Sequence, residues 1–301
     1  MANQFENKVQ HWVPQCYLRQ WCDVDIPKGQ TPYVWLFSKD WSIQKRKAPS
    51  NIFAENELYT IDMPSGIRNL YIENGLSKLE TSYSQVVSKI VKNEPITTDD
   101  QEVLSVFIVA MQARTPFQRD HMQHQWGEAY SLMEDMQRQY QDATPEQKEG
   151  MSSIERVNED RPNFSMKEVQ RIAEKPLQET LIPMIKVQTS VLLQMNLAIL
   201  YSISKARFLT SDNRYVLFDP ESSKRHWLYR GGIGYDTVEI SLPITPRHLL
   251  LLTWRELPPH IDITRKQVEL FNQRHWAYAH DLVVSNSKID KPSWVPDQVI
   301  I

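Results

Sequence analysis

The sequence predicts an α+β protein in which a helical middle section packs on a mixed or antiparallel sheet built from N-terminal and C-terminal strands. Helical hydrophobic periodicity fills the middle of the 301-residue chain, whereas short runs rich in aromatic and β-branched residues cluster towards its two ends. The sequence has no internal repeat that would indicate a solenoid. Because strands and helices are segregated along the chain, we expect a single domain over residues 1–301, with a C-terminal tail at 286–301.

The N-terminal third is expected to contribute strands and one short helix. Pro14 suits the first turn of that helix, where its missing N–H would be unpaired anyway. The aromatic-rich segments 33–38 and 41–45 predict a β-hairpin closed by a Lys-Asp turn. Residues 51–60 predict a helical turn that leads into a strand.

The middle of the chain is predicted to be helical. Apolar residues at three- and four-residue spacings predict an amphipathic helix over 69–92. Thr98 is the expected N-cap of a helix over 99–114, which is apolar on nearly all sides and should be buried centrally. Further helices are expected over residues 117–140, 165–175 and 178–194. The polar, proline-punctuated segment 143–162 is expected to be a mobile insertion or lid, or a solvated linker.

The last third changes to β structure. Strands are predicted over residues 195–202, 207–210, 215–219, 237–242 and 249–254, followed by a helix over 264–280 and a strand over 282–285. We expect the N-terminal strands to join this C-terminal sheet.

Composition narrows the classes of function and partner. The formal net charge of −3 does not favour a nucleic-acid partner, since non-specific binding needs many Lys and Arg contacts to phosphate, although a local basic groove stays open. A protein partner is also open. Cys16 and Cys22 are the only cysteines and no apolar leader precedes them, which suits a reducing, cytoplasmic compartment. The longest apolar stretch, 192–203, is too short and too polar to span a membrane.

Asp212 is the strongest candidate for a catalytic side chain. It lies with Asn213 between two apolar strands, and scaffolds often present catalytic groups at strand ends. The alternative is structural, because Ser, Asp and Asn are favoured in turns, where their side chains bond to the local backbone.

His11, Gln15 and Glu55 form a second group of polar candidates. His11 and Gln15 are four residues apart near the expected first helix. A histidine can act as a general base near neutral pH, but more often it is a hydrogen-bonded packing residue. Glu55 lies close to Glu57, and this spacing is only weakly informative.

Arg114 closes the helix that should be buried, so its charge must be paired. The pairing is either a structural salt bridge or recognition of an anionic ligand by the planar guanidinium. A metal site is a weaker candidate on the helix that follows, where His121, His124 and Glu128 lie along one stripe. That segment lacks the spacing of a zinc helix and is polar on all sides, as a solvated surface would be.

Five segments occur in an order and at separations that resemble a bacterial family known as domain of unknown function 4238. They are HWVPQCYLR from His11, IFAENELYT from Ile52, the stretch that ends QARTP at Pro116, LTSDN from Leu209 and LPITPR from Leu242. The resemblance covers about residues 9–285.

The polar positions that the family's motifs share fall here on His11, Gln15, Glu55, Arg114, Asp212, Asn213 and Arg247. The family usually has proline after Ser-Asp-Asn, whereas this chain has Arg214, which should loosen the turn and place a cation beside the candidate site. The resemblance implies a shared polar site and no particular reaction.

These residues support two classes of function. As an enzyme, the chain would hydrolyse a phosphoester in a nucleotide or nucleic acid. The catalytic residues would then be His11, Glu55 and Asp212, and the substrate-binding residues Gln15, Arg114, Asn213 and Arg247. A divalent metal is a conceivable cofactor, with Glu55 and Asp212 as its ligands.

As a non-enzymatic protein, the chain would use the same cleft to bind a ligand or partner, for example as a sensor in bacterial stress or phage defence. A third alternative makes the motifs structural. In that case Asp212 stabilises a turn, Arg114 pairs with Glu55, and His11 bonds to a backbone carbonyl.

Overall fold

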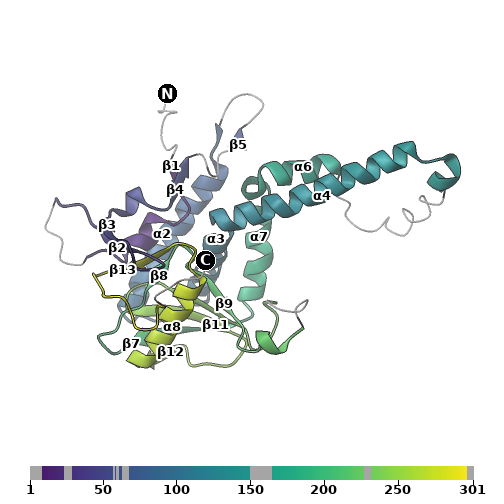
Figure 1. Ribbon diagram of the computed structural model, residues 1–301. Coiled ribbons are helices and arrows are strands. Elements are labelled where there is room, and N and C mark those ends of the chain that lie inside the picture. Colours follow the sequence, from purple (N-terminus) through teal and green to yellow (C-terminus); the bar gives the residue numbers. More distant parts are fainter. Residues whose placement is uncertain are drawn as a thin grey trace. The chain divides into compact units, whose positions relative to one another are not determined.

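The computed structural model describes residues 9–23, 29–56, 58, 61–62, 68–149, 165–226 and 232–296. Two compact units are present, one made of Met1–Thr115 with Met184–Ile301 and the other of Pro116–Pro183 (Figure 1). Both crossings between the units fall at a proline, since Pro116 begins one helix and Pro183 lies inside another. Whether the chain behaves as the single domain expected from its sequence stays a prediction.

The first unit contains the sheets and four complete helices of the described chain. Its helices are α1 (Gln15–Arg19), α2 (Tyr71–Val91), α3 (Thr98–Ala113) and α8 (Arg265–Tyr278), together with the second half of α7 (Pro176–Leu192). Its N-terminal strands are β1 (Val9–His11), β2 (Val34–Ser38), β3 (Gln44–Lys47), β4 (Ala54–Asn56), β5 (Ile61–Asp62) and β6 (Arg68–Asn69). Its C-terminal strands are β7 (Asn196–Ser202), β8 (Thr210–Ser211), β9 (Val216–Phe218), β10 (Glu239–Pro243), β11 (His248–Thr253), β12 (His260–Ile263) and β13 (Leu282–Ser285).

The two larger sheets differ in where their strands come from. A five-stranded sheet has the order β12-β7-β11-β10-β9 and is antiparallel except for the parallel β12–β7 pair. A four-stranded sheet, β3-β2-β13-β8, joins N-terminal and C-terminal strands. The predicted α+β class is therefore confirmed. The five-stranded sheet takes all its strands from the C-terminal part, and β1 pairs separately with β4.

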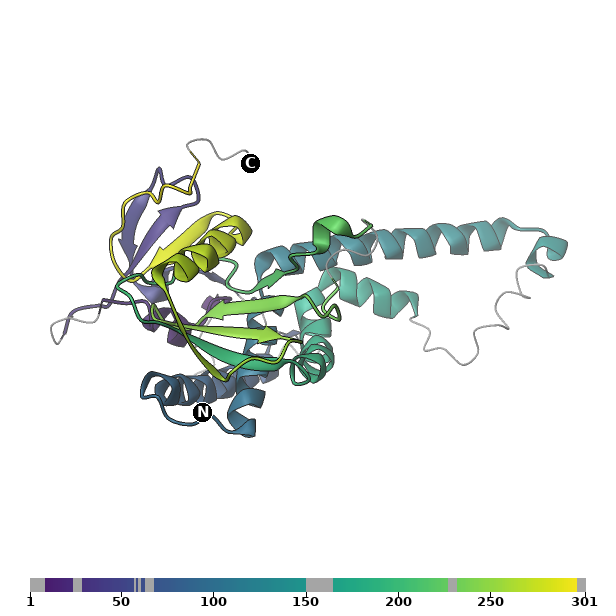
Figure 2. The same ribbon diagram turned by 90° about the horizontal axis from the view of Figure 1, so that it is seen from below.

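Helices cover both faces of the five-stranded sheet (Figure 2). On one face, Ser241 of β10 lies 3.1 Å from the Nε2 of His275 in α8. The other face packs on α2 and α3, and this contact forms the main core. Phe107 of α3 is completely buried there and stacks on Tyr83 of α2. The prediction that α3 is the central buried helix is confirmed.

Some boundaries differ from the predictions for local physical reasons. Thr97, not Thr98, is the N-cap of α3, because its hydroxyl accepts from the Asp100 N–H while the Asp100 carboxylate accepts from the Thr97 N–H. Strand β3 starts later than predicted because Trp41 has a left-handed φ of 64° and belongs to the turn. Strand β12 was not predicted: its four residues alternate polar and apolar side chains, but the run is short.

The second unit is helical and consists of α4 (Pro116–Asp142), α6 (Met166–Glu174) and the first half of α7. Helices α4 and α6 pack against each other, and Ser165 caps α6 in a capping box with Glu168. The predicted insertion spans residues 143–162, and most of it lies in the stretch 150–164, outside the described residues. No helix in the described ranges has both the length and the apolar character that crossing a membrane requires.

Candidate functional site

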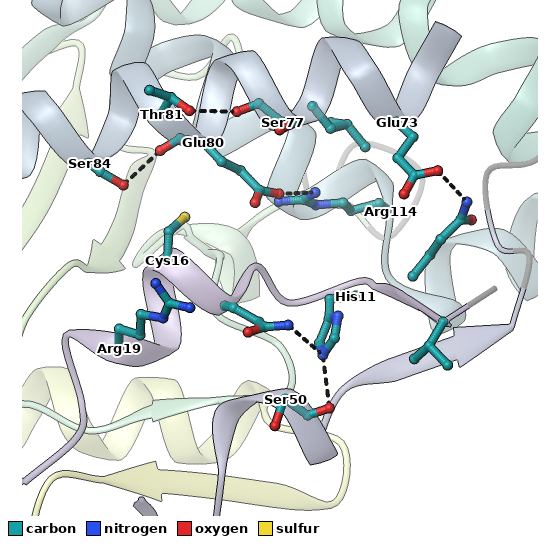
Figure 3. Close-up of a pocket in the computed structure, with 14 residues that line it drawn as sticks. His11, Cys16, Arg19, Ser50, Glu73, Ser77, Glu80, Thr81, Ser84 and Arg114 are labelled. Atoms are coloured by element: carbon teal, nitrogen blue, oxygen red, sulfur yellow. Dashed lines mark hydrogen bonds and ion pairs between the residues drawn. The ribbon is translucent and has the colours of Figure 1, made fainter. Parts of the chain in front are cut away.

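A polar pocket of about 610 Å³ lies in the first unit. Its two main walls are helices α1 and α2, and we call it the α1–α2 pocket. The α1 wall carries Gln15, Cys16 and Arg19, and His11, the last residue of β1, lies beside it. His11, Cys16 and Arg19 are labelled in Figure 3. The α2 wall carries Glu73, Ser77, Glu80, Thr81 and Ser84. Three of the residues predicted from the sequence, His11, Gln15 and Arg114, meet in this pocket.

The sequence places polar groups on both walls through local geometry. Pro14 ends the extended chain and α1 begins at Gln15, which puts Gln15 and Arg19 on one helix face. On α2, polar residues recur at 73, 77, 80 and 84, so they form one stripe along the helix. The opposite stripe of α2, which includes Tyr83 and Val87, is buried in the core. The amphipathicity of α2 therefore produces both a core face and a pocket wall.

The back of the pocket is a buried ion pair. Arg114 Nη1 lies 3.1 Å from Glu80 Oε1, and the arginine side chain is 1% exposed. Its Nη2 meets only the sulfur of Met111 at 3.7 Å, and its Nε has no hydrogen-bond partner among the described residues. Arg114 thus fixes the Glu80 carboxylate at the pocket surface and is itself shielded from solvent.

His11 is oriented by a backbone carbonyl. Its Nε2 lies 3.2 Å from the Ser50 carbonyl oxygen, which can only accept, so this nitrogen must donate. The Gln15 amide lies beside the same nitrogen, at 3.5 Å. Burial lowers the pKa of His11, and Arg114 adds to this, against the opposing effects of the Ser50 carbonyl and Glu80. At neutral pH the ring is therefore neutral, and its Nδ1 makes no hydrogen bond to any residue that the structure describes.

Arg19 and Cys16 complete the α1 wall. Arg19 is exposed, and within the described chain its guanidinium forms no ion pair or hydrogen bond. It extends from α1 towards the α2 wall (Figure 3). Burial raises the pKa of Cys16 to about 12, so at neutral pH the residue is a thiol and not a nucleophilic thiolate. Among its described lining residues, the pocket thus presents the Arg19 cation, the neutral His11 imidazole and the carboxylates of Glu73 and Glu80.

Asp212 does not line this pocket. Its carboxylate accepts three backbone N–H groups where β13 begins, from His280 at 2.9 Å, Asp281 at 2.7 Å and Leu282 at 2.9 Å. The side chain is therefore occupied in joining β8 to β13. The expectation that Asp212 shares a cleft with His11 and Arg114 is not met. Its bonds are also not those of a local turn, because the amides lie about seventy residues away in sequence.

Glu55, Asn213 and Arg247 are also outside the pocket lining. Glu55 is the cross-strand partner of Gln10, a lining residue, so it lies next to the pocket. The Asn213 amide donates to the Tyr278 carbonyl at 2.9 Å. Arg247 donates to the Tyr201 hydroxyl at 3.1 Å. The suggested Arg114–Glu55 pair is wrong, since Arg114 pairs with Glu80.

Arg214, which stands where the family usually has proline, is buried, and its cation does lie beside Asp212, as expected. Its guanidinium donates to the carbonyls of Asp212 at 2.7 Å, Met111 at 2.7 Å and Trp12 at 3.4 Å. Met111 lies in the last turn of α3, where carbonyl groups lack helical partners and a cation is favourable. Arg214 therefore joins the β8–β9 connection to the end of α3 and to the start of the chain.

The described residues do not form a metal centre. Among them, no group of three His, Cys, Asp or Glu side chains is placed to hold a metal ion. On α4, the predicted set reduces to His124 Nε2 and Glu128 Oε1 at 3.4 Å on an exposed surface, while His121 stacks on Phe117. Glu55 and Asp212, the other suggested ligands, do not converge either, because the Asp212 carboxylate is occupied by backbone N–H groups.

Sequence reasoning missed Glu80, Glu73 and Arg19. The four-three-four spacing of polar residues on α2 was a usable signal for the two glutamates, since it implies a polar stripe on an otherwise core-forming helix. Arg19 belongs to the HWVPQCYLR segment and lies four residues after Gln15, so helical spacing could have identified it as well.

No curated protein and no solved structure matches the chain. A family profile, described as Protein of unknown function (DUF4238), matches residues 9–289. The match spans both walls of the α1–α2 pocket and nearly the whole of the 301-residue chain. The chain therefore belongs to the DUF4238 family.

Proposed function

We propose that the chain binds a small polar ligand that carries an anionic group, and that the α1–α2 pocket is the binding site. The observation that carries this proposal is the Arg19 guanidinium, which has no partner among the described residues and faces a wall held in place by the buried Arg114–Glu80 pair. An exposed cation that lines a preformed polar pocket is suited to an anionic ligand.

The opposite wall indicates the rest of the ligand. Glu80 and Glu73 offer carboxylate acceptors, and Ser77 offers a hydroxyl. These groups suit hydroxyl or amino donors on the ligand. A phosphorylated sugar or a nucleotide combines such donors with an anionic group, and the pocket volume of about 610 Å³ is within the range of small-molecule sites.

A thermal-shift and calorimetry screen of nucleotides and sugar phosphates tests the proposal. A ligand at about a hundred times its dissociation constant should stabilise the native state by roughly 2.7 kcal/mol. We expect Arg19→Ala to weaken binding roughly 10–100-fold, as for loss of a charge-assisted hydrogen bond. The matched control is Arg255→Ala, an exposed arginine away from the pocket. If the two variants bind equally well, the proposed site is wrong.

Hydrolysis of a phosphoester is the second candidate function, and the Nδ1 lone pair of His11 favours it. With Nε2–H donated to the Ser50 carbonyl, Nδ1 is the basic atom of a neutral imidazole. In the proposed step, Nδ1 takes a proton from water while the water oxygen attacks phosphorus. The bond to the leaving alkoxide breaks, and the imidazolium returns the proton to that oxygen.

A nitrophenyl phosphate monoester and diester are suitable probes of this activity. His11→Gln should abolish turnover while keeping ligand binding within a few-fold. Because burial lowers the pKa of His11, the acid limb of the wild-type rate profile should lie below pH 6.5, the ordinary histidine value. Equal rates for wild type and His11→Gln would exclude this role for His11.

We further infer that the protein works in a reducing compartment, the bacterial cytoplasm. Its only two cysteines, Cys16 and Cys22, are both unpaired thiols, as is usual in that compartment. Localisation of a fluorescent fusion tests this directly, and accumulation outside the cytoplasm would overturn it.

A further inference from the structure

A second pocket, of about 360 Å³, lies at one end of the five-stranded sheet. Strand residues Tyr201, His248, His260 and Asp262 line it, and Ile90 and Asn93 at the end of α2 also contribute. We call it the sheet-end pocket. It shares no lining residue with the α1–α2 pocket.

Strand register brings the polar groups together on one sheet face. Tyr201 of β7 pairs with His248 of β11 on one side and with Asp262 of β12 on the other. His260 pairs with Ile199, two residues before Tyr201. Because directly paired residues point to the same side of a sheet, these four polar side chains share the face that packs on α2.

The proton on His248 is fixed by its neighbour. Thr245 Oγ1 accepts the backbone N–H of Arg247 at 3.1 Å and that of His248 at 3.0 Å, which occupies both its lone pairs. Its own proton is therefore donated to His248 Nδ1, 2.8 Å away. The ring must carry its proton on Nε2, which makes no hydrogen bond to a described residue.

His248 stays in this form over a wide pH range. Burial lowers its pKa to about 4, and the nearby charges of Arg247 and His260 add to the effect. The residue is 9% exposed and lines the pocket, so its Nε2–H is a fixed, neutral donor available at the cavity wall.

Tyr201 supplies a second donor. Its oxygen accepts from Arg247 Nη1 at 3.1 Å, which leaves its own O–H proton without a partner among the described residues. Arg247 has no carboxylate partner in the described chain, and neither has Arg207, whose pKa is lowered first by burial and then by Arg247. Neither arginine lines the pocket, but Arg247 is bonded to the lining residue Tyr201, and Arg207 lies close enough to Arg247 and Tyr201 for their charges to interact. Asp262 is the one carboxylate among the described lining residues.

We propose that the sheet-end pocket binds the oxyanion of a small, hydroxyl-bearing phosphate ester. His248 Nε2–H and the Tyr201 O–H donate to the oxyanion, and Arg247 and Arg207 balance its charge. Asp262 is exposed at the rim and would repel a bare anion. A ligand hydroxyl that donates to Asp262 removes this conflict, which is why a phosphate ester fits better than free phosphate.

Calorimetry with ribose 5-phosphate and with inorganic phosphate at low salt tests the proposal. We expect ribose 5-phosphate to bind more tightly, and its binding to shift the Nε2–H resonance of His248. Tyr201→Phe removes one donor to a charged group and should weaken binding roughly 10-fold or more. Arg247→Gln should weaken it similarly, while the matched control Arg255→Gln leaves it unchanged.

The outcomes separate this site from the α1–α2 pocket. If ribose 5-phosphate does not bind at millimolar concentration, or binds equally to wild type, Tyr201→Phe and Arg247→Gln, the inference is wrong. If Arg19→Ala abolishes binding and Tyr201→Phe does not, the phosphate occupies the α1–α2 pocket. In that case the sheet-end site is excluded while the proposed function stands.

Discussion

The carboxylate of Glu80 meets the guanidinium of Arg114 at 3.1 Å, with the glutamate side chain 27% exposed and the arginine side chain 1% exposed. The pair joins α2 to the end of α3 and faces the pocket from behind. Because the arginine is the buried member and its Nε has no partner within the described chain, its charge depends on this one carboxylate.

Replacing Glu80 by glutamine should destabilise the protein. Removing one partner of a buried pair costs about 3–5 kcal/mol, but Glu80 is partly solvated, so we expect roughly 1–3 kcal/mol. Urea unfolding measures the change, with Glu73→Gln as the control on the same helix. Adding Arg114→Met should recover part of the loss, since no unpaired buried charge then remains. If Glu80→Gln and Glu73→Gln have equal free energies of unfolding, the Arg114–Glu80 pair does not stabilise the protein.

Asp212 is expected to matter for stability and not for ligand binding. Asp212→Ala leaves the N–H groups of His280, Asp281 and Leu282 without their acceptor, which should cost roughly 2–4 kcal/mol. Asp212→Asn keeps one acceptor oxygen and should lose less. Denaturant unfolding tests whether stability decreases in the order wild type, Asp212→Asn, Asp212→Ala. A folded Asp212→Asn protein that lost ligand affinity would return Asp212 to the functional site.

Arg214 is expected to hold the end of α3 in place. Arg214→Met keeps the volume and removes the donors to the Met111 and Asp212 carbonyls, which should cost about 2–4 kcal/mol. Arg214→Lys keeps the charge but not the planar guanidinium, so its stability should lie between those of wild type and Arg214→Met. Urea midpoints of the three proteins test this. Equal midpoints would mean that these bonds contribute nothing net to stability.

The fold was largely predictable because its signals are local. The periodicity of α2 and the apolar run of α3 both follow from helix geometry, and the aromatic strand β2 follows from strand preferences, whereas its hairpin partner β3 is polar. Strand β12 alternates polar and β-branched residues but is only four residues long, so its pattern is brief, and it is held in place by its parallel pairing with β7.

The site was predictable only in part, because the type of a residue does not determine where its side chain points in the fold. His11, Gln15 and Arg114 were identified, and they do meet. Asp212 has the chemistry of a catalytic residue, but its carboxylate is directed at backbone amides about seventy residues away. Glu80 was overlooked because only the packing of α2 against α3 reveals that Arg114 needs it.

Acid should destabilise the protein through two buried histidines. Burial lowers the pKa of His275 to about 3, with Arg274 adding to the effect, and burial lowers that of His248 to about 4. In the unfolded chain both titrate near 6.5. The unfolded state therefore binds protons first as pH falls, so stability is complete above about pH 6.5 and declines towards the folded-state values.

The contribution of His275 to this loss of stability can be measured separately from that of His248. Between pH 6.5 and 5, each histidine should remove roughly 1.5 kcal/mol of unfolding free energy. His275→Gln takes away one of the two contributions, so its plot of stability against pH should be shallower than that of wild type, whatever its absolute stability. His124→Gln, at a site 73% exposed, should keep the wild-type slope. Urea unfolding at several pH values measures the slopes, and parallel plots for wild type and His275→Gln would show that His275 is not the group that titrates.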